Sequence, residues 1–335
     1  MNKRLLLFLF ILPGLQVAAQ RVVSQPVATR IEKFSPALDA IIDVQAKAEV
    51  IADSFAWCEG PLWVEQEQML LFSDVPSNII YKWTVSKGKE VYLQPSGYTG
   101  TIPRGGETGS NGLTLDRNGR LVICQHGDRR VARMEAPLGQ PASSFTTLAD
   151  GYNGKKFDSP NDVVVRSNGD IFFTDPPYGL EKNVDDPGKE APYQGVYKIA
   201  NAGEKVTMLV DTIERPNGLA FFPGEKRLLI ANSYPGKAVW YVYDIGKDDA
   251  LVKGRIFYDA TADSRTEKGL PDGCKIDARG NVYATGPGGL WIFDAAGTLL
   301  GKIKVGDLVS NCSISPDRVL YMTANHRVLR IRLKR

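Results

Sequence analysis

Six polar residues recur along the chain, each at the start of a similar short motif. They are Glu59, Asn111, Asn161, Asn217, Asp272 and Asn311. Each is followed by Gly, Asp or Cys, then by apolar residues, a tight turn, and β-branched residues that close on a polar one. Carboxylate and amide oxygens are the ligands that hard cations such as Ca²⁺ prefer. If the fold gathers these side chains, they could hold a metal ion.

The motif that contains these residues predicts the fold. It reads NGLTLDRNGRLVICQH from Asn111 and NDVVVRSNGDIFFTD from Asn161, and it recurs at intervals of about 40 to 56 residues. Alternating apolar and polar positions around Asn-Gly turns indicate paired β-strands. Between the hairpins there is room for two further strands. Four strands repeated six times predict an all-β, six-bladed β-propeller over residues 48–335.

The two ends of the repeat region predict how the ring closes. The last motif leaves too few residues for a full blade, whereas residues 48–54, AEVIADS, resemble a strand that lies before the first motif. We expect this N-terminal strand to complete the last blade. Residues 20–47 form an extension, in which the apolar residues of 28–46 suggest a short helix on the rim. The propeller is then one closed domain.

In a propeller, the first strand of each blade lines the central channel. The six motif starts should therefore meet at one end of this channel, where two carboxylates without a counter-charge would repel each other and lose hydration. A bound cation solves both problems, with Ca²⁺ preferred and Mg²⁺, Mn²⁺ or Zn²⁺ as alternatives. The competing interpretation is a hydrogen-bonded plug of Asn and Asp side chains with water.

Other residues near the motif starts are candidates for substrate binding. The hairpin should return His126 beside Asn111 and Asp175 beside Asn161. His126 could orient substrate or relay a proton, or simply make a structural hydrogen bond. Asp175 could bind substrate hydroxyls, although bracing Asn161 is the favoured role. Glu107 lies in a Gly-rich loop suited to a lid, where it contacts a sugar or only solvent.

Five motifs together resemble the senescence-marker-protein (SMP-30)/gluconolactonase family of six-bladed propellers. The motifs are CEGPLW, SNGLTLD, SPNDVVV, RPNGLAF and LPDGCKID. The resemblance covers residues 48–335 and implies a calcium- or divalent-metal-dependent hydrolase of sugar lactones. Glu59, Asn217 and Asp272 match the family's metal ligands. Asn161 matches a residue at the metal or beside it, and Asp272 also matches the general base.

Two departures from related patterns bear on specificity and mechanism. Some gluconolactonases carry Arg two residues before the position of Asn161, where this chain has Ser159. This puts an identical sugar-lactone specificity in doubt. The more distant paraoxonases carry a pair of His on the second blade. Here Asn111 occupies the first of these positions and only His126 resembles the second, so that a His dyad is not supported.

The leading hypothesis is a metal-dependent lactonase with Asp272 as general base. Substrate-binding residues would be Asn111, His126, Asp175 and Glu107. A phosphotriester or aryl-ester hydrolase that uses the same metal site is one alternative. A non-catalytic propeller that binds sugar or protein is another. The substrate class expected is a small-molecule lactone, and we expect the protein to be a monomer.

The first residues resemble a secretion signal. Residues 1–19 combine a basic start with a short apolar run and small residues, which predicts cleavage after Ala19 and export to the periplasm or medium. The alternative, an uncleaved anchor, would be shorter than the roughly 20 residues that a span needs and would contain Pro13. After cleavage we expect no membrane association. A formal net charge of only +3 argues against a nucleic-acid partner.

Export would make disulfides chemically accessible to this chain. The four cysteines are Cys58, Cys124, Cys274 and Cys312. Four in a chain of this length do not make a disulfide scaffold. We expect buried free thiols, with pairing as the alternative.

Overall fold

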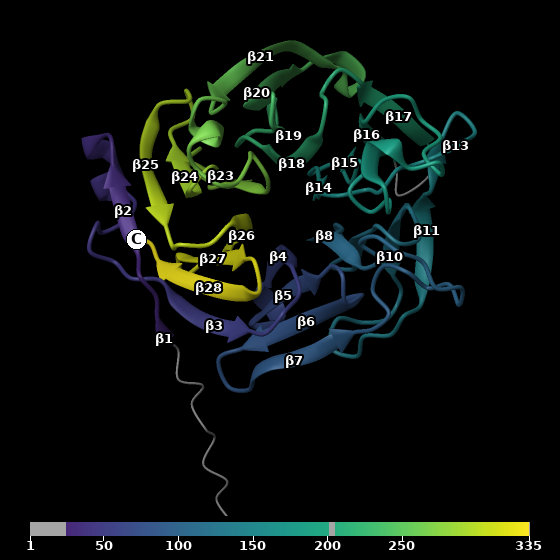
Figure 1. Ribbon diagram of the computed structural model, residues 1–335, viewed down its shortest axis with the longest axis horizontal. Helices are drawn as coiled ribbons and strands as arrows, with labels where there is room; N and C mark the ends of the chain where they lie inside the picture. Colours follow the sequence, from purple (N-terminus) through teal and green to yellow (C-terminus); the bar gives the residue numbers. More distant parts are fainter. Residues whose placement is uncertain (1–24, 201–204, 335) are drawn as a thin grey trace, which may run out of the picture.

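A ring of six antiparallel sheets surrounds a central channel in the computed structural model, which describes residues 25–200 and 205–334 (Figure 1). The six-bladed propeller expected from the repeat is confirmed. The predicted signal segment, residues 1–19, lies outside the described residues. In the described part of the chain, no helix is long and apolar enough to cross a membrane.

The first three blades follow the chain from the inner strand to the outer one. The first consists of β4 (Cys58–Val64), β5 (Met69–Asp74), β6 (Ile79–Thr84) and β7 (Gly88–Leu93). The second consists of β8 (Ser110–Leu115), β9 (Leu121–Gln125), β10 (Arg130–Met134) and β11 (Phe145–Ala149). A small hairpin, β12 (Gly151–Tyr152) and β13 (Lys155–Lys156), leads to the third. This third blade consists of β14 (Val163–Val165), β15 (Ile171–Asp175), β16 (Gly195–Ala200) and β17 (Lys205–Val210).

The other three blades close the ring. The fourth consists of β18 (Pro216–Phe221), β19 (Arg227–Tyr234), β20 (Lys237–Ile245) and β21 (Leu251–Asp259). The fifth consists of β22 (Cys274–Ile276), β23 (Val282–Gly286), β24 (Gly289–Phe293) and β25 (Leu299–Lys304). The sixth has β26 (Val309–Ile314), β27 (Val319–Ala324) and β28 (Arg327–Arg332) from the C-terminal end of the chain.

The N-terminal extension completes two blades. Strand β3 (Glu49–Asp53) pairs antiparallel with β28, with Val50 opposite Leu329, so the predicted closure of the last blade is present. Strand β1 (Gln25–Pro26) pairs with β3. The sequence did not predict that β2 (Arg30–Lys33) would pair with β25 as a fifth strand of the fifth blade. The extension thereby joins the fifth and sixth blades along their outer edge.

Helical structure in the described residues is confined to five short 3₁₀ helices. They are η1 (Pro36–Ala40), η2 (Glu65–Glu67), η3 (Asn183–Asp185), η4 (Lys247–Asp249) and η5 (Asp263–Arg265). Of these, η1 lies in the extension, where a short helix was expected. Ser35 caps it, because its hydroxyl accepts a hydrogen bond from the Ala37 N–H at 3.3 Å. Leu38 of η1 is fully buried and packs between the fifth and sixth blades.

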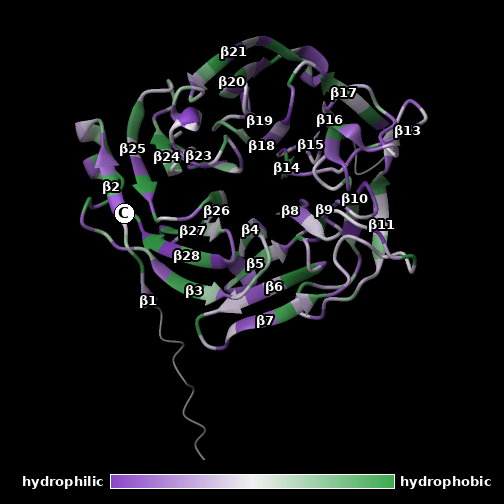
Figure 2. Cartoon of the chain, in the orientation of Figure 1, coloured by the Kyte–Doolittle hydropathy of each residue, from purple (hydrophilic) through white to green (hydrophobic). Residues whose placement is uncertain are grey.

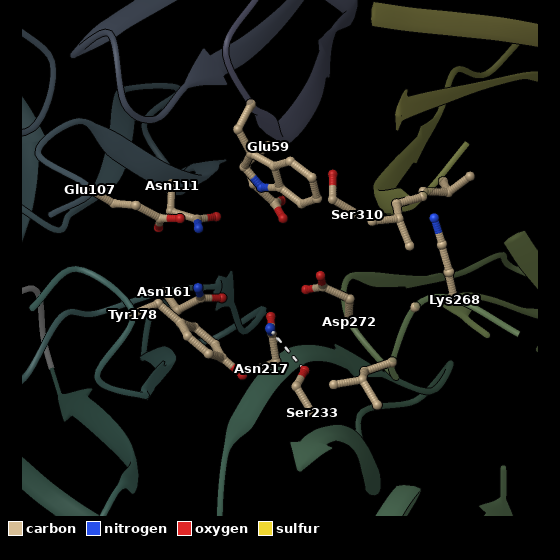
Figure 3. Close-up of a pocket in the computed structure, with 15 residues that line it drawn as sticks. Glu59, Glu107, Asn111, Asn161, Tyr178, Asn217, Ser233, Lys268, Asp272 and Ser310 are labelled. Atoms are coloured by element: carbon tan, nitrogen blue, oxygen red, sulfur yellow. Dashed lines mark hydrogen bonds between the residues drawn. The ribbon is translucent and has the colours of Figure 1, made fainter. Parts of the chain in front are cut away.

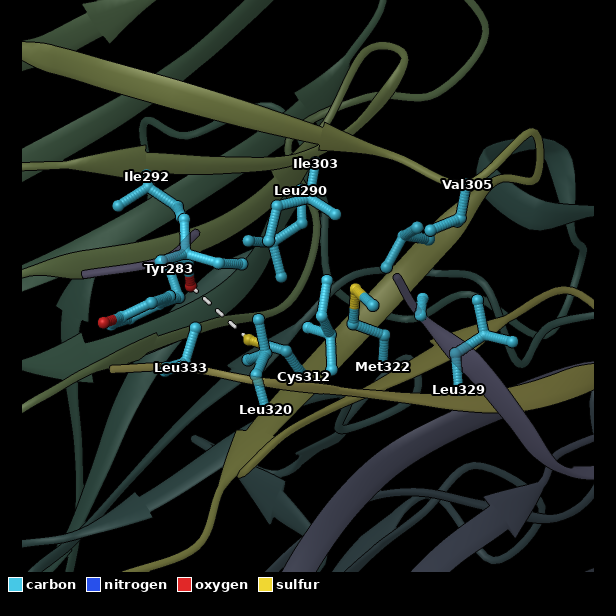
Figure 4. Close-up of a cluster of buried hydrophobic side chains, with 14 of the residues drawn as sticks. Tyr283, Leu290, Ile292, Ile303, Val305, Cys312, Leu320, Met322, Leu329 and Leu333 are labelled. Atoms are coloured by element: carbon cyan, nitrogen blue, oxygen red, sulfur yellow. Dashed lines mark hydrogen bonds between the residues drawn. The ribbon is translucent and has the colours of Figure 1, made fainter. Parts of the chain in front are cut away.

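The core lies between adjacent blades, because each sheet buries both of its faces. Figure 2 shows the resulting mixture of apolar and polar positions along the strands. Figure 4 shows one such layer, in which Leu290 and Ile303 of the fifth blade meet Met322 and Leu329 of the sixth. All four cysteines are buried and unpaired, as expected. Packing of this kind gives a rigid ring on which loop side chains can be held.

The inner hairpin turns are shaped by their own acidic residues. Asp116 accepts hydrogen bonds from the N–H groups of Asn118 and Arg120 at 2.8 and 2.9 Å. Asp277 repeats this pattern with the N–H groups of Arg279 and Asn281. Such side-chain-to-backbone bonds stabilise tight turns. These two carboxylates therefore shape the turns of the inner hairpins.

Candidate active site in the central channel

The residue directly after a motif start is glycine in most repeats, because the backbone of the neighbouring blade lies very close to it. A Cβ atom on Gly112 would lie 2.6 Å from the carbonyl oxygen of Asn161, and one on Gly218 would lie 2.3 Å from that of Asp272. In addition, the Gly112 N–H donates to the Asn161 carbonyl at 2.7 Å. Only glycine permits this approach between the inner strands of neighbouring blades. The backbone of one motif thus fixes the next motif start around the channel.

Five of the six motif starts line one cavity at the mouth of the channel. The cavity has a volume of about 410 Å³. Its walls include the five motif starts Glu59, Asn111, Asn161, Asn217 and Asp272. Figure 3 shows their polar ends converging on a common space, with Glu59 and Asp272 on adjoining sides. The sequence prediction that these side chains would meet is therefore reproduced in the structure.

Asn311, the sixth motif start, does not line the cavity. Its side chain lies beside Glu59, with its amide nitrogen 3.4 Å from Glu59 Oε2, and its amide oxygen accepts from the Cys312 N–H at 2.8 Å. Lys275 Nζ is 3.4 Å from the same amide oxygen. Asn311 therefore supports a cavity carboxylate from behind, with its orientation set by two donors.

Both cavity carboxylates have a raised proton affinity. Burial, supported by the negative charge of Asp162, raises the pKa of Glu59 to about 8. Burial and then the charge of Glu59 raise the pKa of Asp272 well above its usual range. Two such groups in one buried site require a proton or a cation between them. This is the electrostatic situation that the sequence predicted for an empty channel.

A third carboxylate and a lysine lie in the channel next to this pair. Asp162 occupies the position that is glycine after most of the other motif starts, and its Oδ2 is buried without a hydrogen-bond partner. Lys275 donates to the Cys274 carbonyl at 3.0 Å. Burial alone would lower the pKa of Lys275. Nearby negative charges, above all that of Asp162, outweigh burial and raise this pKa. The chain thus carries one positive charge of its own inside the channel.

The donor set fits a hard cation. Within the described residues, no three His, Cys, Asp or Glu side chains cluster at one point as metal ligands. However, calcium sites also use amide oxygens. The Asn217 amide nitrogen donates to Ser233 Oγ at 3.1 Å, which leaves the amide oxygen free for a ligand (Figure 3). Asn111 Oδ1 is likewise buried without a partner. The cavity therefore offers two carboxylates and several amide oxygens.

Asp175 does not line the cavity, contrary to its candidacy as a substrate ligand. Its carboxylate accepts from the N–H groups of Asp158 and Ser159 at 2.9 and 2.7 Å, in the segment that leads into Asn161. The first blade has the same device, since Asp74 accepts from the Trp57 N–H at 3.0 Å, just before Glu59. Asp175 is thus placed as a brace, which was the favoured of its two roles.

His126 lies behind the cavity wall, while Glu107 lies on it. His126 is fully buried, and its Nδ1 is 3.3 Å from Glu107 Oε2. Glu107 lines the cavity from the loop between the first and second blades. Arg104 anchors this loop, because its guanidinium donates to the carbonyls of Gly127 and Gly179 at 2.6 Å each. His126 therefore lies next to Glu107 without lining the cavity, and both of its ring nitrogens are buried without a hydrogen-bond partner among the described residues.

Several cavity residues were not predicted as ligand contacts. The main ones are Tyr178, Ser233, Lys268, Leu270 and Leu308. Most lie outside the strands in the segments between them, where no periodic pattern marks them. Burial, followed by the charge of Asp272, raises the pKa of Tyr178, so its hydroxyl stays protonated and can donate. Trp57, two residues before Glu59, also lines the cavity.

Known proteins share both the sequence motifs and the fold of this chain. The model of the SMP-30/gluconolactonase/LRE-like region matches residues 57–326. The chain belongs to this family. It is 37% identical over 328 residues to a gluconolactonase from Zymomonas mobilis, a match that covers 96% of this chain and 91% of that one. The resemblance inferred from the five motifs is thereby confirmed.

Other relatives agree in fold and in name. The solved gluconolactonase XC5397 from Xanthomonas campestris superposes with a TM-score of 0.79 at 28% identity, over 93% of this chain and 97% of that chain. A pentonolactonase, XacC from Haloferax volcanii, is 25% identical over 74% of this chain and 73% of its own length. The named activities of these relatives are all lactone hydrolyses.

Proposed function

We propose that this protein hydrolyses sugar lactones with the help of a divalent cation, preferably Ca²⁺, bound in the channel mouth. One observation carries the proposal. Two carboxylates, the buried Glu59 and the half-buried Asp272, face a ring of amide side chains in an open cavity, in a chain 37% identical to a gluconolactonase. A ring of this kind suits a cation and leaves space beside it for a small molecule.

The ligands of this cation would be Glu59, Asn161, Asn217 and Asp272. When bound, the ion supplies positive charge that polarises the lactone carbonyl. Ser233 holds Asn217 in place, because it accepts from the amide nitrogen and donates its own proton to the carbonyl of Pro271. The same hydroxyl thus ties the fourth blade to the residue before Asp272.

Asp272 is the proposed general base. Hydrolysis adds the hydroxyl of water to the carbonyl carbon, breaks the bond from this carbon to the ring oxygen, and leaves a proton on that oxygen. Asp272 takes the proton of the attacking water and returns it to the ring oxygen, which yields the hydroxy acid. General-base assistance of this kind contributes roughly 10²–10⁴-fold.

Further side chains would hold the substrate. Tyr178, as a protonated phenol, and Asn111 can hydrogen-bond to the lactone or its hydroxyls. Glu107 accepts from a sugar hydroxyl on the opposite side of the cavity from Asp272. All these residues come from one chain, so a monomer suffices for activity.

The test compares the wild-type protein with Asp272→Asn in the pH-stat hydrolysis of glucono-1,5-lactone with added calcium. We expect a loss of at least about 100-fold in kcat, because the amide cannot accept the proton. Asp294→Asn is the matched control, since Asp294 only shapes an outer turn through the N–H groups of Ala296 and Thr298. Equal rates for Asp272→Asn and the control would contradict the role of Asp272.

A second substrate class is favoured by one specific observation. One wall of the cavity is apolar and includes Leu270, Leu308 and Val309. Such a wall can accept the ring of an aryl ester or an aryl phosphotriester, which the same cation would activate. Phenyl acetate and a nitrophenyl phosphotriester therefore belong in the assay. A higher kcat/KM for these than for any lactone would move the assignment to this class.

Export is a further part of the proposal. Residues 1–19 would be removed after Ala19, and the mature protein would begin at Gln20. N-terminal sequencing of protein recovered from the periplasm or the medium tests this directly. Recovery of full-length protein from the cytoplasmic fraction alone would contradict export.

A further inference from the structure

Lys268 is the single cationic side chain among the described residues that line the cavity. It stands on the side of the cavity opposite Glu107 and beyond Asp272 (Figure 3). Its side chain is exposed to solvent. The remaining charged residues of the wall, Glu59, Glu107 and Asp272, are all acidic. The cavity therefore has negatively charged groups near the channel and one positively charged lysine at its edge.

The two acidic residues that share the outer hollow with Lys268 are already paired with other cations. Glu267 contacts Lys304 at 2.6 Å, and Asp307 contacts Arg327. No ion pair or hydrogen bond of the Lys268 ammonium occurs among the residues that the structure describes. A cation on the wall of a cavity with no protein partner is available to a ligand.

The backbone holds Lys268 at this position. Its carbonyl accepts a hydrogen bond from the Gly288 N–H at 2.8 Å. The next residue, Gly269, has a φ of +107°, and a Cβ atom there would lie 3.0 Å from the carbonyl oxygen of Gly286. Glycine is needed for this conformation. The segment is thus built to a fixed shape, and the lysine side chain starts from a defined point.

Space continues past Lys268 to the outside. A second hollow of about 410 Å³ shares Lys268 and Leu308 with the main cavity. Leu270 and Leu308 form the apolar wall beside the lysine. A ligand whose carbonyl end lies among Glu59 and Asp272 can therefore extend along this wall and place its other end at the ammonium.

We propose that Lys268 is a specificity residue that recognises an anionic group at the end of the lactone remote from its carbonyl. The substrates favoured are then acidic sugar lactones, with either a carboxylate or a phosphate at this end. Lysine binds both anions as a point charge. This inference rests on the proposed lactonase function and names the substrate class of the same site.

The experiment measures kcat/KM for three lactones with calcium present. They are glucono-1,5-lactone, a glucaric acid monolactone and 6-phosphoglucono-1,5-lactone. The two anionic lactones distinguish a carboxylate from a phosphate as the preferred group. We expect the better anionic lactone to exceed the neutral one by about fivefold or more, in line with an exposed charge pair.

Variants identify the residue responsible. Lys268→Gln should raise KM for the anionic lactones about fivefold and leave the neutral one unchanged, and Lys268→Glu should reverse the preference. Lys87→Gln, an equal charge change in the exposed turn between β6 and β7, is the matched control. A wild-type preference for the neutral lactone, or an anionic preference that survives in Lys268→Glu, would overturn the proposal.

Product binding separates this proposal from the lactonase function itself. Calorimetry compares gluconate with glucarate and 6-phosphogluconate in the calcium-loaded protein, and needs no turnover. Tighter binding of an acid with a second anionic group that is lost in Lys268→Gln supports the anion subsite even if every lactone is inert. Equal binding by wild type and Lys268→Gln rejects the subsite even if gluconolactone is hydrolysed.

Discussion

At the scale of single residues, the channel acids govern how the metal-free protein responds to pH. The pKa of Glu59 rises from 4.5 to about 8 in the fold. The folded state therefore binds more protons than the unfolded state between these values. Stability is accordingly highest below pH 4.5 with respect to this group and falls as pH rises to about 8. Asp272 acts in the same direction.

This decrease in stability with rising pH leads to a prediction for Glu59→Gln in protein from which metal has been removed with a chelator. The variant should be more stable than the wild type at pH 7.5, by roughly 1 kcal/mol or more, because Gln needs neither the proton that Glu59 takes up on folding nor a buried charge. It should also bind calcium more weakly. Urea unfolding at pH 5 and pH 7.5, with and without calcium, measures both effects. Lower stability of chelated Glu59→Gln than of chelated wild type at pH 7.5 would contradict this account.

At the scale of elements, the inner strands depend on close backbone contacts between blades. Gly218→Ala would place a Cβ 2.3 Å from the Asp272 carbonyl oxygen, so we expect a loss of about 2 kcal/mol in the free energy of unfolding. It should also weaken calcium binding, because the clash moves Asp272. Gly246→Ala is the control, since its Cβ would meet nothing closer than 3.4 Å. Thermal unfolding compares the two, and equal melting temperatures would count against the contact.

The elements also show how far sequence reasoning reaches. The period of the repeat determined the blades, and the short last unit pointed to β3 as the missing strand. The motif starts could be placed together because the inner strands of a propeller converge. In contrast, β2 carries no motif, and its pairing with β25 depends on the path of the extension. Lys268 and Tyr178 come from loops, whose shape depends on contacts that no periodicity records.

His126 shows the same limit at one position of the second blade. Counting along the hairpin placed it near Asn111. Its ring is not part of the cavity wall, which is formed there by the neighbouring Glu107 from a loop. Asp175 was easier, because a carboxylate at the end of a strand can accept from the N–H groups of the neighbouring segment, as it does from Asp158 and Ser159. The position of a residue along a strand can thus be predicted from the sequence, whereas the way a loop packs against that residue cannot.

At the scale of the whole molecule, six blades and the N-terminal extension that joins two of them form a ring around one polar site. Because the proposed ligands lie in or just before the inner strands of four blades, a cation there would link the first, third, fourth and fifth blades across the channel. Binding should therefore stabilise the entire ring. The same cavity is lined by Glu59 and Asp272 on the channel side and by Lys268 at its edge. Metal and substrate would therefore enter through the same opening.

The most direct measurement is the hydrolysis of glucono-1,5-lactone by the wild-type protein after chelation and again after calcium is restored. The account predicts negligible enzymatic turnover in the chelated protein and full recovery with calcium. The fold should remain intact in both states, as followed by circular dichroism. Undiminished turnover in fully chelated, folded protein would contradict the metal-dependent mechanism. Absence of turnover with every lactone, despite tight calcium binding, would contradict the lactonase assignment itself.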